Sequence, residues 1–201
     1  MENIILKRFK ESSEVKTRFL KENLPKLLDV VKLISHAFEA GNKVFFFGNG
    51  GSAADAQHFA AEFVNRYIMD RPPLPAIALT TDSSVLTSIS NDFAFSEIFA
   101  KQLRALGKEG DVAVGISTSG HSANVVKAFE VAKEMGIKTV ALAGNEGGAV
   151  AKMADLSLVV PSTSTPRIQE VHILIGHVLC ELVEHHLFLK DVAATSGSPG
   201  R

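Results

Sequence analysis

Short, uninterrupted apolar runs recur along the middle of the chain, and each ends at glycine, proline or small polar residues. Apolar runs of this length are typical of strands buried on both faces of a sheet. Between them, apolar residues recur every three or four positions, which is typical of helices packed on one side. Strands that alternate with helices predict a parallel sheet covered on both faces. We predict strands over residues 44–47, 76–79, 112–116, 139–142 and 156–160.

The helical spacing is clear in several segments. Leu27, Val31, Ile34 and Phe38 fall on one side of a helix that we expect to end at Gly41. We predict helices over residues 1–22, 25–40, 53–67, 97–106, 122–135 and 167–188. The fold class is therefore α/β, a parallel sheet of about five strands flanked by helices, with helical N- and C-terminal segments.

No linker divides the sequence, so we predict a single domain over residues 1–190. Within it, residues 1–40 form the N-terminal helices, and residues 43–190 form the α/β core and the last helix. Residues 191–201 are small and polar, and we expect a disordered tail there.

The charge of the chain is nearly balanced, at −1 over 201 residues. We therefore expect no binding to nucleic acid or to an anionic membrane. The most apolar stretch, residues 171–189, is interrupted by histidines and glutamates, which argues against a membrane span. The one cysteine, Cys180, lies in that stretch and is expected to be a core residue. A single cysteine cannot form an intrachain disulfide, which fits a reducing compartment, so we expect a cytoplasmic protein.

Two predicted strands run into loops rich in glycine or hydroxyl groups, and each loop opens a helix. The first loop is Asn49-Gly50-Gly51-Ser52, and the second carries Ser117, Thr118, Ser119 and Ser122. In an open parallel sheet both loops lie at the carboxyl edge, where ligands bind. Four hydroxyls at a helix N-terminus favour a phosphate group, because the exposed N–H groups and the helix dipole attract an anion.

Other readings of these loops remain open from the sequence. Ser119 or Ser122 is also a suitable N-cap residue. The glycines of the first loop fit a loose dinucleotide pattern, but Asp82 lies later than that pattern expects. No Gly-Lys-Ser/Thr motif is present, so the loops suit a sugar monophosphate better than a nucleoside triphosphate.

A second group of residues suggests acid–base chemistry. His58 and Glu62 lie four positions apart and so share one face of a helix, while Gln169 and His177 lie two turns, roughly 12 Å, apart on the last helix. His58 with Glu62 is equally readable as a solvated pair, and His177 as a core side chain. The four side chains are ligands that a divalent metal accepts, but the spacing leaves metal binding open. Aldose–ketose isomerisation needs a base and a second proton-handling group, and Glu62 and His177 are the natural pair.

Several long motifs occur in a fixed order along the chain. They are Gly48-Asn-Gly-Gly-Ser52 with Asp55 and His58, Arg71-Pro72, Asn91-Asp92-Phe93, Gly115-Ile-Ser-Thr-Ser-Gly120 with Ser122, and Arg167-Ile-Gln-Glu170 with His172 and His177. In these motifs the chain resembles the sugar isomerase (SIS) domain family and, within it, the phosphoheptose isomerases. The resemblance extends from the N-terminal helices to about Phe188.

The resemblance implies conversion of sedoheptulose 7-phosphate to D-glycero-D-manno-heptose 7-phosphate through an enediol. This would be the first step towards activated heptose for lipopolysaccharide cores or other surface glycans. It also implies a flavodoxin-like SIS fold and a homotetramer with active sites at subunit junctions. The resemblance also implies roles for individual residues. Sugar contacts fall on Asn91, Asp92 and Gln169, the base is Glu62 with His177 as its partner, and a zinc ion is held by His58, Glu62, Gln169 and His177. Phosphate binding falls on Asn49, Gly50, Gly51, Ser52, Ser117, Thr118, Ser119 and Ser122.

Two positions depart from the family pattern: His121 replaces a usual asparagine, and Pro166 replaces an acidic sugar contact of some members. These departures affect fine substrate contacts. The main alternative is a non-catalytic SIS scaffold, resembling the paralogue that binds the replication initiator DnaA. That paralogue lacks the glutamate and the final-helix histidine, whereas this chain keeps Glu62 and His177. A sugar-phosphate sensor and a nicotinamide-dependent enzyme are further alternatives.

Overall fold

One parallel sheet organises the molecule. In the computed structural model, which describes residues 1–189, five strands pair in the order β2-β1-β3-β4-β5. All five predicted runs become strands, with small differences at their ends. Their bounds are β1 Val44–Gly48, β2 Ala76–Ala78, β3 Val112–Ser117, β4 Lys138–Gly144 and β5 Leu156–Val160.

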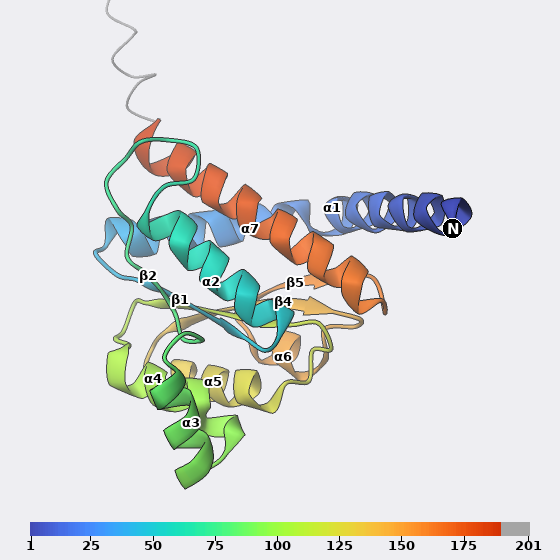
Figure 1. Cartoon of the computed structure of the whole chain (residues 1–201). Helices are drawn as coiled ribbons and strands as arrows, with labels where there is room; N and C mark the ends of the chain where they lie inside the picture. Colours follow the sequence, from blue (N-terminus) through green and yellow to red (C-terminus); the bar gives the residue numbers. More distant parts are fainter. Residues whose placement is uncertain (190–201) are drawn as a thin grey trace, which may run out of the picture.

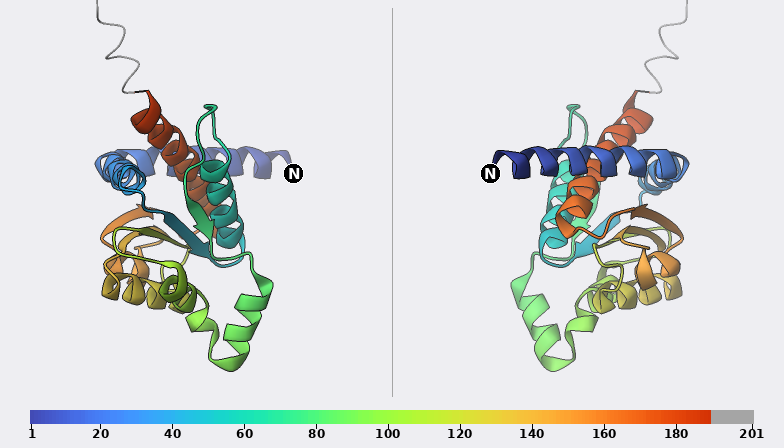
Figure 2. Two further views of the ribbon diagram at one scale, coloured as in Figure 1. Left: turned by 90° about the vertical axis from the view of Figure 1, so that its left-hand side faces the viewer. Right: turned by 90° about the vertical axis from the view of Figure 1, so that its right-hand side faces the viewer.

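Helices cover both faces of the sheet (Figure 1). One face carries α1 (Glu2–Glu39), α2 (Gly51–Val64) and α7 (Thr165–Phe188), and the other carries α4 (Ile98–Leu106), α5 (Ala123–Glu134) and α6 (Gly148–Met153). Helix α3 (Ser83–Asp92) and the 3₁₀ turn Phe95–Glu97 extend away from the sheet (Figure 2). This arrangement confirms the α/β prediction.

Strand β1 shows how the sequence builds both layers. Successive side chains of a strand point to opposite faces. Phe46 therefore packs against Phe59 and Phe63 of α2, at ring separations of 5.9 Å in both cases. Phe47 points the other way and packs against Phe129 of α5 at 5.9 Å. The apolar run thus supplies a core to each side of the sheet.

The N-terminal segment corrects one prediction. Separate helices over residues 1–22 and 25–40 are wrong, because α1 is continuous and contains Pro25. A proline inside a helix removes one backbone donor. Here neighbouring residues are anchored in the core: Leu27 is buried, and the amide of Asn23 donates to the carbonyls of Phe19 and Val159 at 3.1 and 3.4 Å. These contacts on both sides of Pro25 keep α1 continuous.

Two further helices were not predicted. Helix α3 is short and has no fully buried residue, and only Leu86 and Ile89 pack partly against the core, so its apolar pattern in the sequence is weak. Helix α6 has only six residues, too few to show a helical period. The residues assigned to a disordered tail, 191–201, lie outside the described residues.

Helix α7 is, by length and composition alone, the one helix among residues 1–189 that is long and apolar enough to cross a membrane. Its apolar residues pack within the molecule: Ile168, Val171, Ile175 and Leu179 are all buried. Cys180 is also buried, which raises the pKa of its thiol far above the usual range. These contacts are those of a core helix and confirm Cys180 as a core residue.

Candidate active site

The two predicted phosphate loops meet at the carboxyl edge of the sheet. Strands β1 and β3 are neighbours, so the loops that follow them begin side by side. The side-chain amides of Asn49 and Asn124 exchange two hydrogen bonds, of 2.9 and 2.8 Å. This reciprocal pair joins the first loop to the start of α5.

The hydroxyl groups of the second loop are gathered in one place. Ser117 Oγ lies 2.8 Å from Ser122 Oγ and accepts from the backbone N–H of Gly120 at 3.1 Å. Ser119 Oγ accepts from the N–H of His121 at 3.2 Å. Ser122 occupies the N-cap position of α5 but makes no side-chain capping hydrogen bond. Its hydroxyl therefore does not cap the helix and is instead paired with Ser117 within the loop.

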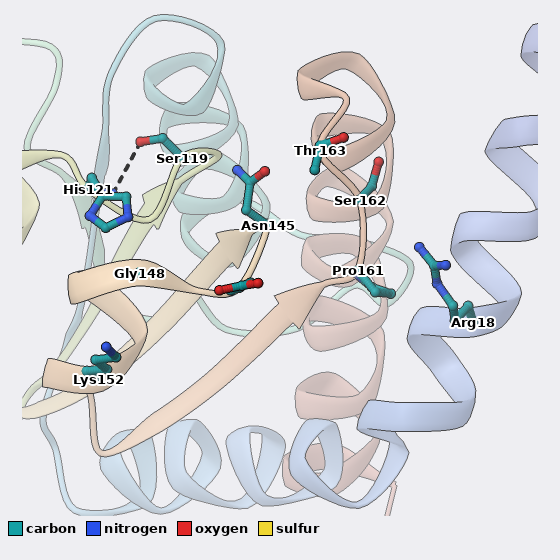
Figure 3. Close-up of a pocket in the computed structure, with 10 residues that line it drawn as sticks. Arg18, Ser119, His121, Asn145, Gly148, Lys152, Pro161, Ser162 and Thr163 are labelled. Atoms are coloured by element: carbon teal, nitrogen blue, oxygen red, sulfur yellow. Dashed lines mark hydrogen bonds between the residues drawn. The ribbon is translucent and has the colours of Figure 1, made fainter.

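A hollow of about 850 Å³ opens beside this loop (Figure 3). Ser119 and His121 line it from one side, and residues of the loops after β4 and β5 line it from the other. Arg18 and Lys152 contribute cationic groups to its lining, and Glu146 contributes a carboxylate. A ligand held by Ser119 therefore has open, partly cationic space next to it, and His121, one of the two departures, faces that space.

The opposite side of the site is formed where α2 packs along α7. Two glycines permit this close approach. A Cβ on Gly176 would overlap the ring of Phe59, and a Cβ on Gly51 would overlap the amide of Gln169. Because neither glycine carries a side chain, the two helices run close enough for polar side chains of both to touch.

His58, Glu62 and His177 meet across this helix pair. The Nε2 atoms of His58 and His177 lie 3.0 Å apart, and Glu62 Oε1 lies 3.5 Å from His58 Nε2. His177 also stacks on the ring of Tyr67, with centroids 5.6 Å apart and planes at 20°. The side chain of His58 is 43% exposed, so the cluster is open to a ligand from solvent.

The cluster has the dimensions of a metal site. Zn–N bonds of about 2.0–2.1 Å place two ligand atoms of a tetrahedral ion roughly 3.3 Å apart. The separations of 3.0 and 3.5 Å bracket that value. Imidazole and carboxylate groups are also the ligands that zinc prefers beside thiolate. His58 therefore lies at a spacing suited to a shared metal from both His177 and Glu62, although the ligand atoms of all three residues are not gathered within 4.8 Å of one another.

Three other predicted residues lie elsewhere. Gln169 is next to Gly51, at the phosphate-loop end of α7, and no contact joins it to the two histidines among the described residues. Asn91 and Asp92 are exposed at the end of α3 and hydrogen-bond to each other at 2.8 Å. Figure 2 shows α3 extending from the far side of the sheet from α2 and α7. Within one chain, Asn91 and Asp92 do not join the cluster.

Asp55 was part of a sequence motif but had no assigned role. It lies one turn before His58 on α2, and burial raises the pKa of its carboxyl to about 6, although His58 works to lower it. Its Oδ2 atom is buried without a hydrogen-bond partner among the described residues. Tyr67 was not predicted at all, because its contact with His177 depends on the path of the loop after α2.

A second group of potential metal ligands lies away from this site. His36 and Glu39 of α1 and His186 of α7 have ligand atoms within 4.8 Å of one another. His36 and Glu39 are exposed. Any measurement of metal binding must therefore separate this group from the cluster around His58.

The chain matches known proteins over most of its length. The family model described as "SIS domain" matches residues 8–144. The chain is similar to a phosphoheptose isomerase of Thermodesulfovibrio yellowstonii, at 53% identity over 188 residues, or 94% of each chain. Its fold is similar to the structure of phosphoheptose isomerase GmhA from Neisseria gonorrhoeae, with a TM-score of 0.86, 44% identity, and coverage of 91% of this chain and 98% of the other. It is also similar to the structure of a phosphoheptose isomerase from Francisella tularensis, with a TM-score of 0.88, 41% identity, and coverage of 91% of this chain and 97% of the other.

Proposed function

The chain belongs to the SIS domain family and, within it, to the phosphoheptose isomerases, and on this basis we propose that it interconverts sedoheptulose 7-phosphate and D-glycero-D-manno-heptose 7-phosphate. The observation that carries the proposal is the full-length similarity to phosphoheptose isomerases at about half identity. The cluster of His58, Glu62 and His177 beside a hydroxyl-rich loop is the chemistry such a reaction needs. The non-catalytic scaffold finds no support among these relatives.

The spacing of the two parts of the site suits the substrate. Gly51 lies at the phosphate loop, and His58 is seven positions further along α2, roughly 10 Å by helical rise. An extended seven-carbon sugar also spans roughly 10 Å from C1 to a phosphorus on C7, by ordinary bond lengths. A heptose held by its 7-phosphate at the loop therefore presents C1 and C2 to the cluster.

The reaction requires one proton to move between adjacent carbons. Glu62 takes a proton from C1 of the ketose while the oxygen on C2 gains one, which forms the enediol. The proton is then returned to C2 and the hydroxyl on C1 loses its own, which gives the aldose. We assign to His177 the transfer of the proton between the two oxygens, because an imidazole carries one nitrogen that donates and one that accepts.

We propose that a zinc ion binds at the same place, held by His58, Glu62 and His177 and by Gln169 from the same helix as His177. The support is the pair of separations that His58 Nε2 makes, 3.0 Å with His177 Nε2 and 3.5 Å with Glu62 Oε1. Binding the ion would require Glu62 and Gln169 to move towards the two histidines. When bound, the ion supplies Lewis acidity beside the sugar oxygens.

Assembly into a homotetramer and a cytoplasmic location are proposed as well. The N-terminal end of α1 exposes several large apolar side chains, including Phe9 at 74%. Contiguous exposed apolar surface of this kind marks interaction sites. We further propose that the product serves the synthesis of activated heptose for lipopolysaccharide or other surface glycans.

The deciding experiment is to incubate the purified protein with sedoheptulose 7-phosphate and follow the aldose by NMR. The reaction is run with added zinc and after chelation, and the amount of bound zinc is measured in parallel. His186→Ala removes the second ligand group without touching the active site, so zinc lost in that variant is counted separately. We expect conversion in zinc and its loss on chelation.

Each part of the proposal has its own contrary result. A folded protein that forms no aldose in either condition rules out the isomerase. Full conversion after complete removal of zinc supports the isomerase activity and shows that the reaction does not need the metal.

A further inference from the structure

The loop between α2 and β2 is folded around one buried carboxylate. Glu184 of α7 has a side chain that is 1% exposed. Its Oε1 accepts from the backbone N–H of Tyr67 at 2.8 Å, and its Oε2 accepts from the N–H groups of Ile68 and Met69 at 3.1 and 3.0 Å. Three successive N–H groups of the loop thus converge on a single side chain of the helix that carries His177.

Arg71 closes the loop from its other end. Its Nε donates to Glu184 Oε1 at 3.0 Å, while its Nη1 donates to the carbonyl of Phe63 at 2.6 Å and its Nη2 to that of Glu62 at 2.9 Å. The last two carbonyls belong to the end of α2. The Arg71–Glu184 pair therefore fastens the loop to both helices of the active site.

This network is more than the fold requires for stability. A buried ion pair is often no more stabilising than well-packed apolar residues of similar size, because both charges must lose their hydration. What the pair does supply is a fixed path for the loop. Along that path, the ring of Tyr67 lies flat against His177, with planes at 20° and centroids 5.6 Å apart.

His177 also meets the reacting cluster. Its Nε2 lies 3.0 Å from His58 Nε2. The imidazole therefore contacts both Tyr67 and His58. A catalytic side chain needs this kind of support, since a displacement of about 1 Å can cost a hundredfold in rate.

We propose that Glu184 and Arg71 are positioning residues that hold Tyr67 against His177 and so fix the imidazole for the isomerisation. The proposal rests on the proposed function. It separates the catalytic group, His177, from a supporting layer that touches neither the sugar nor the reacting atoms.

The chain offers an unusually direct test, because Tyr67 is its only tyrosine and it contains no tryptophan. Fluorotyrosine incorporation therefore gives one ¹⁹F resonance that reports on this ring alone. In Glu184→Gln, a single amide oxygen replaces the two carboxylate oxygens, so at least one loop N–H loses its acceptor. We expect the Tyr67 resonance to shift and kcat to fall about tenfold or more, with KM for the sugar phosphate nearly unchanged.

Variants of Tyr67 test the contact independently of the ion pair. Tyr67→Phe keeps the stacked ring, so we expect kcat within about twofold of wild type, whereas Tyr67→Ala removes the ring and should lower kcat as Glu184→Gln does. Asp70→Asn, on an exposed side chain of the same loop, is the matched control and should leave kcat unchanged. If Glu184→Gln fails to fold, the two Tyr67 substitutions still test the ring contact on which the proposal depends.

Several results would overturn the proposal. Wild-type kcat in Tyr67→Ala would do so, as would a KM increase with kcat unchanged. An unshifted Tyr67 resonance in Glu184→Gln would show that the carboxylate does not place the ring. If the wild-type protein does not act on the sugar phosphate, the proposed function fails, and the resonance still decides whether Glu184 positions Tyr67.

Discussion

Asp55 carries an electrostatic cost at the edge of the candidate active site. Burial raises the pKa of its carboxyl to about 6, from 3.8 for an ordinary aspartate, and His58 only partly offsets this. The folded state therefore favours the protonated acid. The favourable contribution of Asp55 to the free energy of unfolding is therefore fully present below about pH 4. It is lost as the pH rises through 6, because the folded protein must then hold a carboxylate that is poorly solvated.

We expect Asp55→Asn to remove that pH dependence, because an amide resembles the neutral acid. The free energy of unfolding of the variant, relative to wild type, should rise between about pH 4 and pH 7 by on the order of 1 kcal/mol, since solvent screening reduces the effect of a half-exposed group. Urea unfolding of both proteins over this pH range, with a chelator present, measures the difference. Asp70→Asn is the exposed control, and a difference that does not change with pH would contradict the assigned cause.

Two single-atom-scale changes should separate chemistry from binding. Glu62→Gln removes the base, so kcat should fall by about a thousandfold while KM changes little.

Ser119→Ala removes a hydroxyl of the phosphate loop, so KM should rise about tenfold with kcat largely kept. Steady-state kinetics on the sugar phosphate measures both. A Glu62→Gln enzyme with wild-type kcat, or a Ser119→Ala enzyme with wild-type KM, would remove that residue from its role.

Helices α2 and α7 form the element-scale unit of the site, and Gly176 sets their separation. In Gly176→Ala, the new methyl group would overlap the ring of Phe59. Overpacking of this kind costs about 1–3 kcal/mol and shifts the backbone. Because Gly176 precedes His177, we expect lower stability and a reduced kcat together. Thermal unfolding and kinetics measure both.

A second substitution tests this explanation of Gly176. Phe59→Leu shortens the side chain that the methyl group meets, so the double variant should recover part of the lost stability and activity. Equal losses in the single and double variants would show that helix spacing is not the cause.

The same elements show what the sequence could and could not predict. The strands and most helices follow from buried apolar runs, and a parallel sheet places both loops at the same edge. That the loops meet depends on β1 and β3 being neighbours, which the sequence did not predict. Helix α3 has no fully buried residue, and only Leu86 and Ile89 pack partly against the core, so its pattern in the sequence is weak. The contact of His58 with His177 joins residues 119 positions apart, and Tyr67 reaches His177 only through a loop shaped by Glu184. Such contacts depend on helix packing, which local spacing does not encode.

At the scale of the whole molecule, two features are not explained by a single chain. Residues 1–10 are all exposed, and Figure 2 shows this end of α1 extending beyond the sheet. The sugar-contacting residues implied by the family, Asn91 and Asp92, extend on α3 away from the cluster. Assembly of several copies would cover the first feature and would let α3 of one copy approach the site of another.

We therefore expect a tetramer whose activity depends on assembly. Phe9→Asp places a charge on the exposed apolar end of α1, where Phe9 is 74% exposed in one chain, and burying that charge in an interface would be costly. Sedimentation should show smaller species for this variant, and kcat/KM should fall in proportion as the tetramer is lost. Lys133→Gln, on an exposed residue of α5 away from this end of α1, is the control and changes the net charge by the same one unit. A wild-type protein that sediments as a fully active monomer would contradict both the assembly and the shared site, and Asn91 and Asp92 would then need no role in catalysis.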